Sequence, residues 1–512
     1  ITTGTGSDIF RTYELEYDSV GDMSLTHFSR LVKVTEKNGN GEKMNPVTID
    51  WQHLPDGEQE RSTVDINLED FSYIKKQDQN FLSADLNGDG INDIIRISNV
   101  YIDPSGNNNG VGDTFIYIYQ SHKSPDGKIK FSSPYRYRCE QQIDDKRYKD
   151  ILQNCDAIDL DGDGLNDLVF PYLYKIDETD THFLRIYVIY GKDVKQYGSP
   201  GIKRASFLLI KPLTCATDMP CFTTGDFNKD GKDEIFYIED KAVNSKYAAG
   251  LVGYSKDNGQ SHEDYSLPLP KAPKRMFSGD FNNDGLTDII VFYDKGYTIF
   301  YNGGGTGNFF GASSYSDTSL GYNWRMEQGD FNGDGLVDFV YTAEQSWDYY
   351  FALNEGNGKF SVSKAWTTYM PEQSTNKDNA RNNLIVYDID RDGKSDVVVL
   401  KAQYVHHGGL NGRNNFNYTG ICWLRSDGQK LVEYKRTVSP REDDALSGSF
   451  LLGDFTGTGG VDLMGYGCDW FANGTAENKL EMRLYHTKGA DARNWQGIPF
   501  CRRFEEGDDS IL

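Results

Sequence analysis

The sequence predicts an all-β fold, a seven-bladed β-propeller made of four-stranded antiparallel blades. Three observations predict it: an aspartate-rich phrase that recurs seven times, apolar runs of strand length, and an abundance of Gly, Tyr and Phe. The chain has 53 Gly, 33 Tyr and 28 Phe among its 512 residues. This composition suits short strands joined by tight turns. A chain of this length is too long for one ordinary core, but repetitive β architectures grow by adding units.

The repeated phrase reads Asp-x-Asn/Asp-x-Asp-Gly-x-x-Asp/Glu, preceded by an apolar stretch and followed by a β-branched run. We number its nine positions 1 to 9. We name the seven copies loops 1 to 7, in order Asp85–Asp93, Asp159–Asp167, Asp226–Glu234, Asp280–Asp288, Asp330–Asp338, Asp388–Asp396 and Asp454–Asp462. Their first aspartates are 50 to 74 residues apart. A period of this length with variable insertions fits four strands per unit.

Strand signals fill each unit. In the fourth unit we expect strands at 275–279, 288–293, 297–301 and from Phe309 onward. In the fifth we expect them at 339–342, 349–353 and from Phe360 onward. One such sheet cannot bury both of its faces alone, so radial packing of the units is predicted. A linear solenoid is the alternative, although its units are usually shorter and more uniform.

The loops carry the residue types that calcium prefers, since Ca²⁺ takes six to eight carboxylate and carbonyl oxygens. We expect side chains at positions 1, 3 and 5 to converge, the carbonyl of position 7 to join them, and the carboxylate of position 9 to complete the site. Glycine at position 6 lets the backbone turn round the ion. The closing Glu of an EF-hand is absent, because loop 1 has Arg96 at its twelfth position.

The predicted calcium ligands are Asp85, Asn87, Asp89, Ile91 and Asp93; Asp159, Asp161, Asp163, Leu165 and Asp167; Asp226, Asn228, Asp230, Lys232 and Glu234; Asp280, Asn282, Asp284, Leu286 and Asp288; Asp330, Asn332, Asp334, Leu336 and Asp338; Asp388, Asp390, Asp392, Lys394 and Asp396; and Asp454 and Asp462. Loop 7 has Thr456 and Thr458 at positions 3 and 5, so about six sites are predicted and the seventh is degenerate. The alternative is a series of Asx turns that cap hairpins. Clustered carboxylates without a cation are unfavourable, which favours calcium.

The seven loops resemble the FG-GAP/VCBS repeats of integrin α-subunit heads and many secreted bacterial proteins, from Phe81 to the C-terminus. The resemblance implies that each loop joins the first and second strands of a blade. Residues 1–75 lack the repeat and are predicted to form a separate β-rich segment before a propeller at 76–512. The motifs Tyr13-Glu-Leu-Glu-Tyr17, Ser29-Arg-Leu and Asn45-Pro-Val-Thr-Ile-Asp-Trp51 resemble the lead-in of SpvB-type, RHS and insecticidal toxin-complex B proteins. That resemblance implies a docking or gating propeller within a larger polypeptide.

Charge and motifs favour binding over catalysis. With 77 acidic and 53 basic residues the formal net charge is -24, which disfavours nucleic acid and anionic membranes as partners. The sequence has no HExxH, G-x-S-x-G or P-loop motif, and no apolar run long enough to span a bilayer. We therefore expect a non-enzymatic, secreted or cell-surface platform for a protein or glycan. The alternatives are a lectin that uses Trp324, Trp366, Trp423 or Trp470, and a calcium-dependent polysaccharide lyase.

Long insertions are predicted on the side of the propeller opposite the Asp loops. They span 101–113, 366–383, 402–420, 439–447 and 466–478. They supply the candidate ligand-binding residues Tyr101, Tyr369, Tyr404, His406, His407, Arg413, Tyr418, Trp470 and Phe471. Long loops on a rigid scaffold are where binding residues concentrate.

Seven cysteines allow three neighbouring pairs: Cys139–Cys155, Cys215–Cys221 and Cys468–Cys501. Such pairs predict disulfides and an oxidising compartment and leave Cys422 free, while buried thiols are the alternative.

Overall fold

The computed structural model describes residues 2–5, 8–18, 30–38, 43, 47–48, 65–66, 80–98, 114–123, 129–132, 134–139, 155–175, 182–195, 202–213, 220–255, 259–304, 314–317, 320–322, 325–342, 348–367, 381–388, 392–406, 414–439, 449–455, 457, 462–469, 479–486 and 496–498. The described part is all-β, apart from one short helix, α2 (Gly191–Lys195). Among these residues no helix has the length and apolarity needed to cross a membrane.

Seven sheets of the described chain each contain one Asp loop, and we number them sheets 1 to 7. Sheet 1 has β6 (Asn80–Ala84), β7 (Asp93–Ser98), β8 (Thr114–Tyr119) and β11 (Tyr135–Cys139), with β15 (Ile202–Arg204) added beside β11. Sheet 2 has β12 (Asp156–Ile158), β13 (Asp167–Lys175), β14 (His182–Ile189) and β16 (Ser206–Pro212). Sheet 3 has β17 (Cys221–Gly225), β18 (Glu234–Val243), β19 (Lys246–Gly253) and β20 (Ser261–Leu267).

The remaining sheets follow the same order. Sheet 4 has β21 (Arg275–Gly279), β22 (Asp288–Phe292), β23 (Tyr297–Phe300) and β24 (Ser314–Asp317). Sheet 5 has β25 (Met326–Gly329), β26 (Asp338–Thr342), β27 (Asp348–Asn354) and β28 (Phe360–Thr367). Sheet 6 has β29 (Arg381–Tyr387), β30 (Asp396–His406), β31 (Asn414–Ser426) and β32 (Leu431–Ser439), and sheet 7 has β33 (Ser449–Gly453), β34 (Asp462–Asp469), β35 (Lys479–His486) and β36 (Gln496–Ile498).

The strands predicted for the fourth and fifth units are confirmed to within a few residues, with β24 beginning at Ser314 as the largest shift. The predicted loop at 402–420 is wrong. Residues 402–406 continue β30, residues 414–420 begin β31, and the two strands pair from Ala402↔Thr419 to His406↔Asn414. Because β-branched and aromatic residues run on into this segment, the hairpin lengthens at the expense of the loop.

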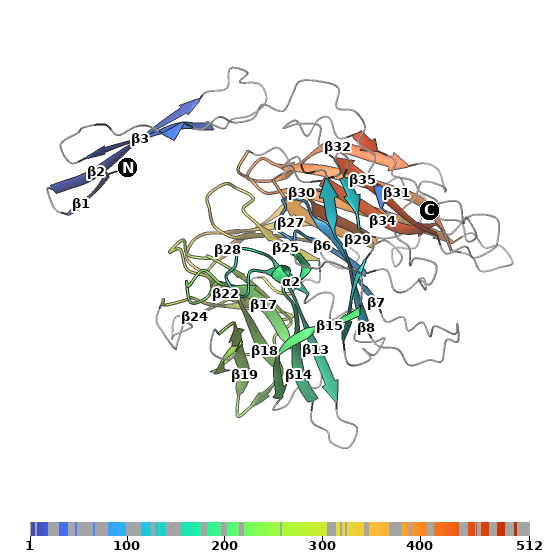
Figure 1. The fold of residues 1–512 in the computed structure, drawn as a ribbon, viewed down its shortest axis with the longest axis horizontal. Helices are drawn as coiled ribbons and strands as arrows, with labels where there is room; N and C mark the ends of the chain where they lie inside the picture. Colours follow the sequence, from blue (N-terminus) through green and yellow to red (C-terminus); the bar gives the residue numbers. More distant parts are fainter. Residues whose placement is uncertain are drawn as a thin grey trace.

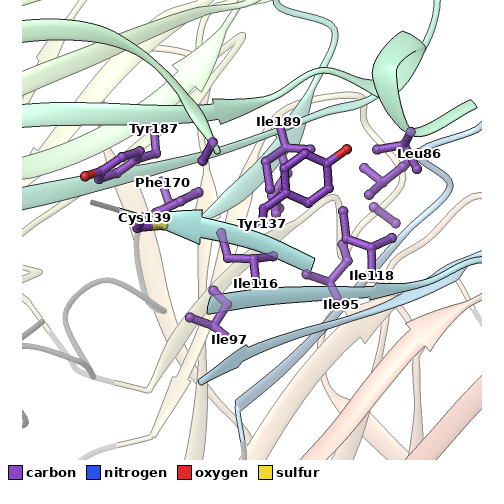
Figure 2. Packing of buried hydrophobic residues seen from close by; sticks show 14 of the residues in the cluster. Leu86, Ile95, Ile97, Ile116, Ile118, Tyr137, Cys139, Phe170, Tyr187 and Ile189 are labelled. Atoms are coloured by element: carbon purple, nitrogen blue, oxygen red, sulfur yellow. The ribbon is translucent and has the colours of Figure 1, made fainter. Parts of the chain in front are cut away.

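Neighbouring sheets pack face to face, and alternate residues of one strand serve the two sides. In β18, Ile235 and Tyr237 lie in a core cluster shared with sheet 2, whereas Phe236 and Ile238 lie in a cluster shared with sheet 4. A period of two with both faces buried explains why these strands are continuously apolar. Figure 2 shows the cluster between sheets 1 and 2, where Ile95 and Ile118 from one sheet approach Ile189 from the other.

The first and last of these sheets are also neighbours. Strand β33 of sheet 7 contacts β6 of sheet 1, and in Figure 1 the blue strands β6 and β7 lie beside the orange and red strands of sheets 6 and 7. The Ser83 hydroxyl donates a hydrogen bond to the Leu452 carbonyl at 2.5 Å. Residues 369 positions apart in the sequence therefore meet in space.

Two further sheets contain no Asp loop. The N-terminal sheet has β1 (Thr2–Thr5), β2 (Asp8–Asp18), β3 (Arg30–Asn38) and β4 (Val47–Thr48), as the alternating pattern of this segment predicts. Cross-strand ion pairs join Lys33 to Glu16 and Lys37 to Glu14. The small second sheet has β5 (Asp65–Ile66), β9 (Ser121–Lys123) and β10 (Ile129–Phe131), so residues 65–66 pair with a segment of the first repeat unit.

Candidate functional site

Each Asp loop joins the first strand of its sheet to the second. The first strand ends one residue before position 1, and the second strand begins at position 9. The glycine at position 6 has a left-handed backbone in loops 1 to 6, with φ between 79° and 86°. A Cβ on Gly90 would meet no atom within 4 Å, so the backbone angle, and not lack of space, requires glycine there.

The carboxylate at position 1 organises the backbone of its own loop. In loop 5, Asp330 Oδ1 accepts hydrogen bonds from the N–H groups of Gly333 (2.7 Å) and Asp334 (3.2 Å), and Oδ2 accepts one from Gly335 (2.9 Å). The bonds from positions 5 and 6 recur at the first aspartates of the other loops, Asp85, Asp159, Asp226, Asp280 and Asp388. These bonds hold the turn in one conformation.

Positions 3 and 5 lie around the same turn. In loop 5, Asn332 Oδ1 accepts the Asp334 N–H (3.0 Å), and Asn332 Nδ2 donates to Asp334 Oδ2 (2.8 Å). Asp334 Oδ1 accepts the N–H of Leu336 at 2.9 Å. Loops 1 and 4 repeat the arrangement.

Loop 2 brings three carboxylates together. One oxygen from each of Asp159, Asp161 and Asp167 lies within 4.8 Å of the others. Two ligands of one calcium ion, each 2.3–2.6 Å from it, are at most about 5 Å apart, so this spacing fits a shared ion. The Oδ1 atom of Asp161 is buried without a hydrogen-bond partner. A buried carboxylate oxygen in this state fits a metal ligand better than a hairpin cap.

The carboxylate at position 9 differs from the others because it is buried and accepts a hydrogen bond from a residue outside its own loop. Asp338 is 0% exposed. Its Oδ2 accepts the N–H of Phe331 at position 2 (3.0 Å), and its Oδ1 accepts the N–H of Asn354 (2.7 Å), which is the last residue of the third strand of the sheet. Position 9 therefore ties the Asp loop to the turn between the third and fourth strands, so both lie at the same end of the sheet.

The sequence reasoning missed the residues that meet position 9 in that second turn. They are Ser121, Gly191, Asn302, Asn354 and Ser426. In three sheets the side chain of this residue also reaches back to the preceding sheet: Asn302 Nδ2 donates to Phe227 O (2.7 Å), Asn354 Nδ2 to Phe281 O (3.0 Å) and Ser426 Oγ to Phe331 O (2.5 Å). In sheets 5 and 6 the signal was an Asn or Ser that ends the third strand just before a glycine-containing turn, whereas Ser121, Gly191 and Asn302 lie two residues past the end of that strand.

Burial without a counter-charge changes the protonation of position 9. Desolvation raises the pKa of Asp93, Asp167, Glu234, Asp288 and Asp338 to about 7. In the last four of these, the other carboxylates of the same loop raise the pKa further, while backbone hydrogen bonds lower it. The loops thus hold acidic groups whose ionised form would gain from a cation.

Adjacent Asp loops are tied to each other through position 8. The Ser395 N–H donates to Asp330 O (2.6 Å), and the Asp330 N–H donates to Ser395 Oγ (3.0 Å). The same reciprocal pair joins Asp233 to Asp159 and Asn92 to Asp454. A Cβ on Gly329 would lie 2.7 Å from Ser395, so glycine before position 1 admits the neighbouring loop.

Loops 6 and 7 are described in part. Asp390 lies outside the described residues, as do Thr456 and Thr458. In loop 7, Asp462 Oδ2 accepts the N–H of Phe455 at 2.9 Å, which is the bond that position 9 makes in the other loops.

Most of the predicted ligand-binding residues lie outside the described part of the chain: Tyr101, Tyr369, His407, Arg413, Trp470 and Phe471. Tyr404 and His406 belong to β30 and Tyr418 to β31, so these three lie on paired strands and not in a loop. Trp423 is 1% exposed, and Trp366 packs against Tyr349 with 5.4 Å between ring centroids. Both tryptophans therefore serve the core, while Trp324 and Trp470 are not described.

The predicted disulfides are not formed among the described cysteines. Cys139 and Cys155 lie in the core cluster between sheets 1 and 2, and both are thiols. Cys221 is also a thiol, and burial raises its pKa to about 12. The apolar surroundings accommodate these thiols as small hydrophobic groups. Cys215 and Cys501 lie outside the described residues.

Comparison with known families identifies repeats in the middle of the chain. Residues 280–341 and 330–399 each match the FG-GAP-like repeat, so this segment, which contains loops 4 to 6, consists of FG-GAP-like repeats. No curated protein matches the sequence. Among solved structures, the chain is similar to an Agrocybe aegerita lectin reported to recognise non-reducing terminal N-acetylglucosamine. The two share 15% identity over 80% of this chain and 91% of the lectin chain, with a TM-score of 0.44.

Proposed function

We propose that loops 1 to 6 bind calcium. The observation that carries the proposal is the convergence of Asp159, Asp161 and Asp167 in loop 2, where one carboxylate oxygen is buried without a hydrogen-bond partner. The other loops share the position 1 bonds that shape this turn. Calcium would supply the positive charge that these carboxylates lack, while the chain itself orients them through backbone hydrogen bonds.

Loop 7 keeps Asp454 and Asp462 but has threonine at positions 3 and 5. Asp462 is used in bonding the loop backbone, which leaves too few carboxylates for a comparable site. We therefore infer that loop 7 keeps its shape for structural reasons and binds calcium weakly or not at all.

We also propose that sheets 1 to 7 are the blades of one seven-bladed propeller. The shared core clusters between consecutive sheets support this arrangement, as does the contact between β33 and β6. A ring buries both faces of every sheet, which an open row of sheets cannot do at its two ends.

The function that fits such a scaffold is recognition of a protein or glycan by a secreted or cell-surface protein, without catalysis. Extracellular calcium is in the millimolar range where sites with Kd of about 10⁻⁴–10⁻³ M are filled. The partner would bind at the end of the sheets opposite the Asp loops, where long insertions join the second and third strands or link consecutive sheets.

Calorimetry and metal titration test the calcium proposal. The melting temperature should rise when millimolar calcium replaces EGTA, because a ligand of the folded state stabilises it by mass action. Titration should give about six sites, and magnesium at the same concentration should stabilise less because it prefers water-rich octahedral sites. An identical melting temperature in EGTA and calcium would rule the proposal out.

A further inference from the structure

In loop 2, one oxygen of the Asp161 carboxylate faces a positively charged side chain, and the other oxygen is open, that is, without a hydrogen-bond partner. Asp161 occupies position 3, where loops 1, 3, 4 and 5 have asparagine. Its side chain is 4% exposed. The Oδ2 atom forms an ion pair with the ammonium of Lys192, whereas Oδ1 is buried without a hydrogen-bond partner. Two oxygens of one carboxylate thus meet different surroundings.

Lys192 lies in the segment after the third strand of sheet 2, which also forms a hydrogen bond to Asp167 at position 9. Strand β14 ends at Ile189, and Gly191 then donates its N–H to Asp167 Oδ1 at 2.8 Å. The next residue is Lys192, so consecutive residues serve positions 9 and 3 of the same loop. In sheets 4 and 5 the residue in the place of Gly191 is Asn302 or Asn354, and glycine or glutamate follows it.

Two tyrosine rings also lie close to the ammonium. It lies 4.7 Å from the ring centroid of Tyr190 and 5.8 Å from that of Tyr254, which follows β19 of sheet 3. The rings meet edge to face at 6.5 Å. Cation–π attraction of this kind keeps an ammonium in place when its carboxylate partner is engaged elsewhere.

We propose that the Lys192 ammonium is an internal competitor of calcium at loop 2, which deepens the calcium function proposed above and depends on it. Without calcium, Lys192 partly neutralises the four carboxylates of the loop. Calcium uses the same Asp161 group, entering at the open Oδ1. Repulsion between the two cations on one carboxylate then breaks the Lys192–Asp161 ion pair, and the ammonium keeps only its contacts with Tyr190 and Tyr254. Loop 2 therefore exchanges one bound cation for another. Its affinity for calcium is set by how much more strongly the carboxylates interact with calcium than with the Lys192 ammonium.

The chain offers an internal contrast in loop 3. There the Lys232 ammonium lies 2.9 Å from Asp230 Oδ2, but that aspartate is 43% exposed and the lysine belongs to the loop itself. Water screens such a pair more strongly than the buried pair of Asp161 with Lys192. Loops 1, 4 and 5 have no such lysine, since position 7 is Ile91, Leu286 or Leu336.

The test compares Lys192→Met with a matched variant, Lys274→Met, which removes a surface lysine 3.9 Å from Asp294, outside every Asp loop. Calcium titration of Lys192→Met should show one site with a Kd roughly three- to tenfold lower and an unchanged number of sites. The metal-free melting temperature of Lys192→Met should fall, and Lys274→Met should match the parent chain.

Amine labelling of the unmodified chain gives a direct readout. Acetylation of Lys192, measured by mass spectrometry, should be several-fold faster in calcium than in EGTA, because the ion pair with Asp161 is broken. Labelling of Lys274 should not change. If calcium binds but Lys192→Met alters no site and the labelling rate is constant, the competition is wrong while the calcium function stands. If neither the parent chain nor Lys192→Met binds calcium, both the calcium proposal and the competition proposal fail.

Discussion

At the residue scale, positions 1 and 9 of the Asp loops divide two tasks. The carboxylate at position 1 accepts hydrogen bonds from backbone N–H groups of its own turn. The carboxylate at position 9 joins the loop to a second turn of the same sheet. Loop 7 supports this division, since it has threonine at positions 3 and 5 but keeps both Asp454 and Asp462. What persists in a degenerate loop is the part that holds the backbone.

Asp338→Ala and Asp334→Ala should separate stability from metal binding. Removing Asp338 leaves the buried N–H groups of Phe331 and Asn354 without acceptors, at about 1–3 kcal/mol each. The melting temperature of Asp338→Ala in EGTA should therefore fall well below that of the parent. Asp334 is an exposed position 5 group, so its removal should weaken calcium binding with little effect in EGTA. Equal effects of the two changes in EGTA would contradict the division of tasks.

The raised pKa values at position 9 predict how the metal-free protein responds to pH. The unfolded chain titrates these acids near 4, whereas burial raises the pKa of groups such as Asp288 to about 7 in the folded state. The folded protein therefore holds more protons between these values, and its stability falls as the pH rises. In EGTA the melting temperature should drop between pH 4 and 7.

Calcium should reverse that trend, because it binds the ionised loops and its affinity grows as they deprotonate. Melting curves at pH 5, 6, 7 and 8, with EGTA or with calcium, check both directions. A melting temperature that rises with pH in EGTA would show that the position 9 acids do not carry an uncompensated charge.

Much at this scale could be predicted from residue types and spacing. The positions of the loops, the glycine at position 6 and the convergence at loop 2 all follow from a repeated phrase. The acceptors and donors outside the phrase could not be predicted, because Ser121 and Lys192 enter the site from the segment after the third strand, and only the register of the second and third strands places that segment beside the loop. Trp423 was open to two interpretations, and only packing decides that it is core.

At the element scale, the residue at position 8 connects one sheet to the next. It follows the turn directly and precedes the second strand, so a polar side chain there reaches the backbone of the preceding loop. Strand bounds in sheets 4 and 5 could be predicted because turns with Asn and Gly mark their ends. The long hairpin of β30 and β31 could not be predicted. Polar residues alternate there with β-branched and aromatic ones, so the sequence resembles a loop, and only pairing across the hairpin reveals the strands.

Asn92→Ala tests the contact between the first and last sheets. Asn92 Oδ1 accepts the Asp454 N–H at 2.9 Å, and the change should cost about 1 kcal/mol. Amide hydrogen exchange should accelerate in β33 and β6. Asn166→Ala is the matched control, because Asn166 Nδ2 donates to Asp85 O between sheets that are consecutive in the chain. Unaltered exchange in β33 would mean that this bond does not join the two sheets.

At the scale of the whole molecule, the two ends of the sheets have different characters. The end with the Asp loops is tied together by bonds within loops, between loops and to the second turn. The other end carries the connections between the second and third strands, which differ in length from residues 244–245 in sheet 3 to residues 99–113 in sheet 1. Rigid scaffolds concentrate recognition in such variable connections.

Replacing residues 407–413 by an Asn-Gly turn should therefore weaken binding to a partner without changing the calcium-dependent melting temperature. The segment connects β30 to β31, and a two-residue turn can close an antiparallel pair without disturbing the strands. Binding is measured on a glycan array and on intact cells, with the parent chain alongside. The control replaces Asn357, an exposed residue of the turn between β27 and β28 at the Asp-loop end, by Ser. If the control abolishes binding and the shortened hairpin does not, the partner binds at the Asp-loop end instead.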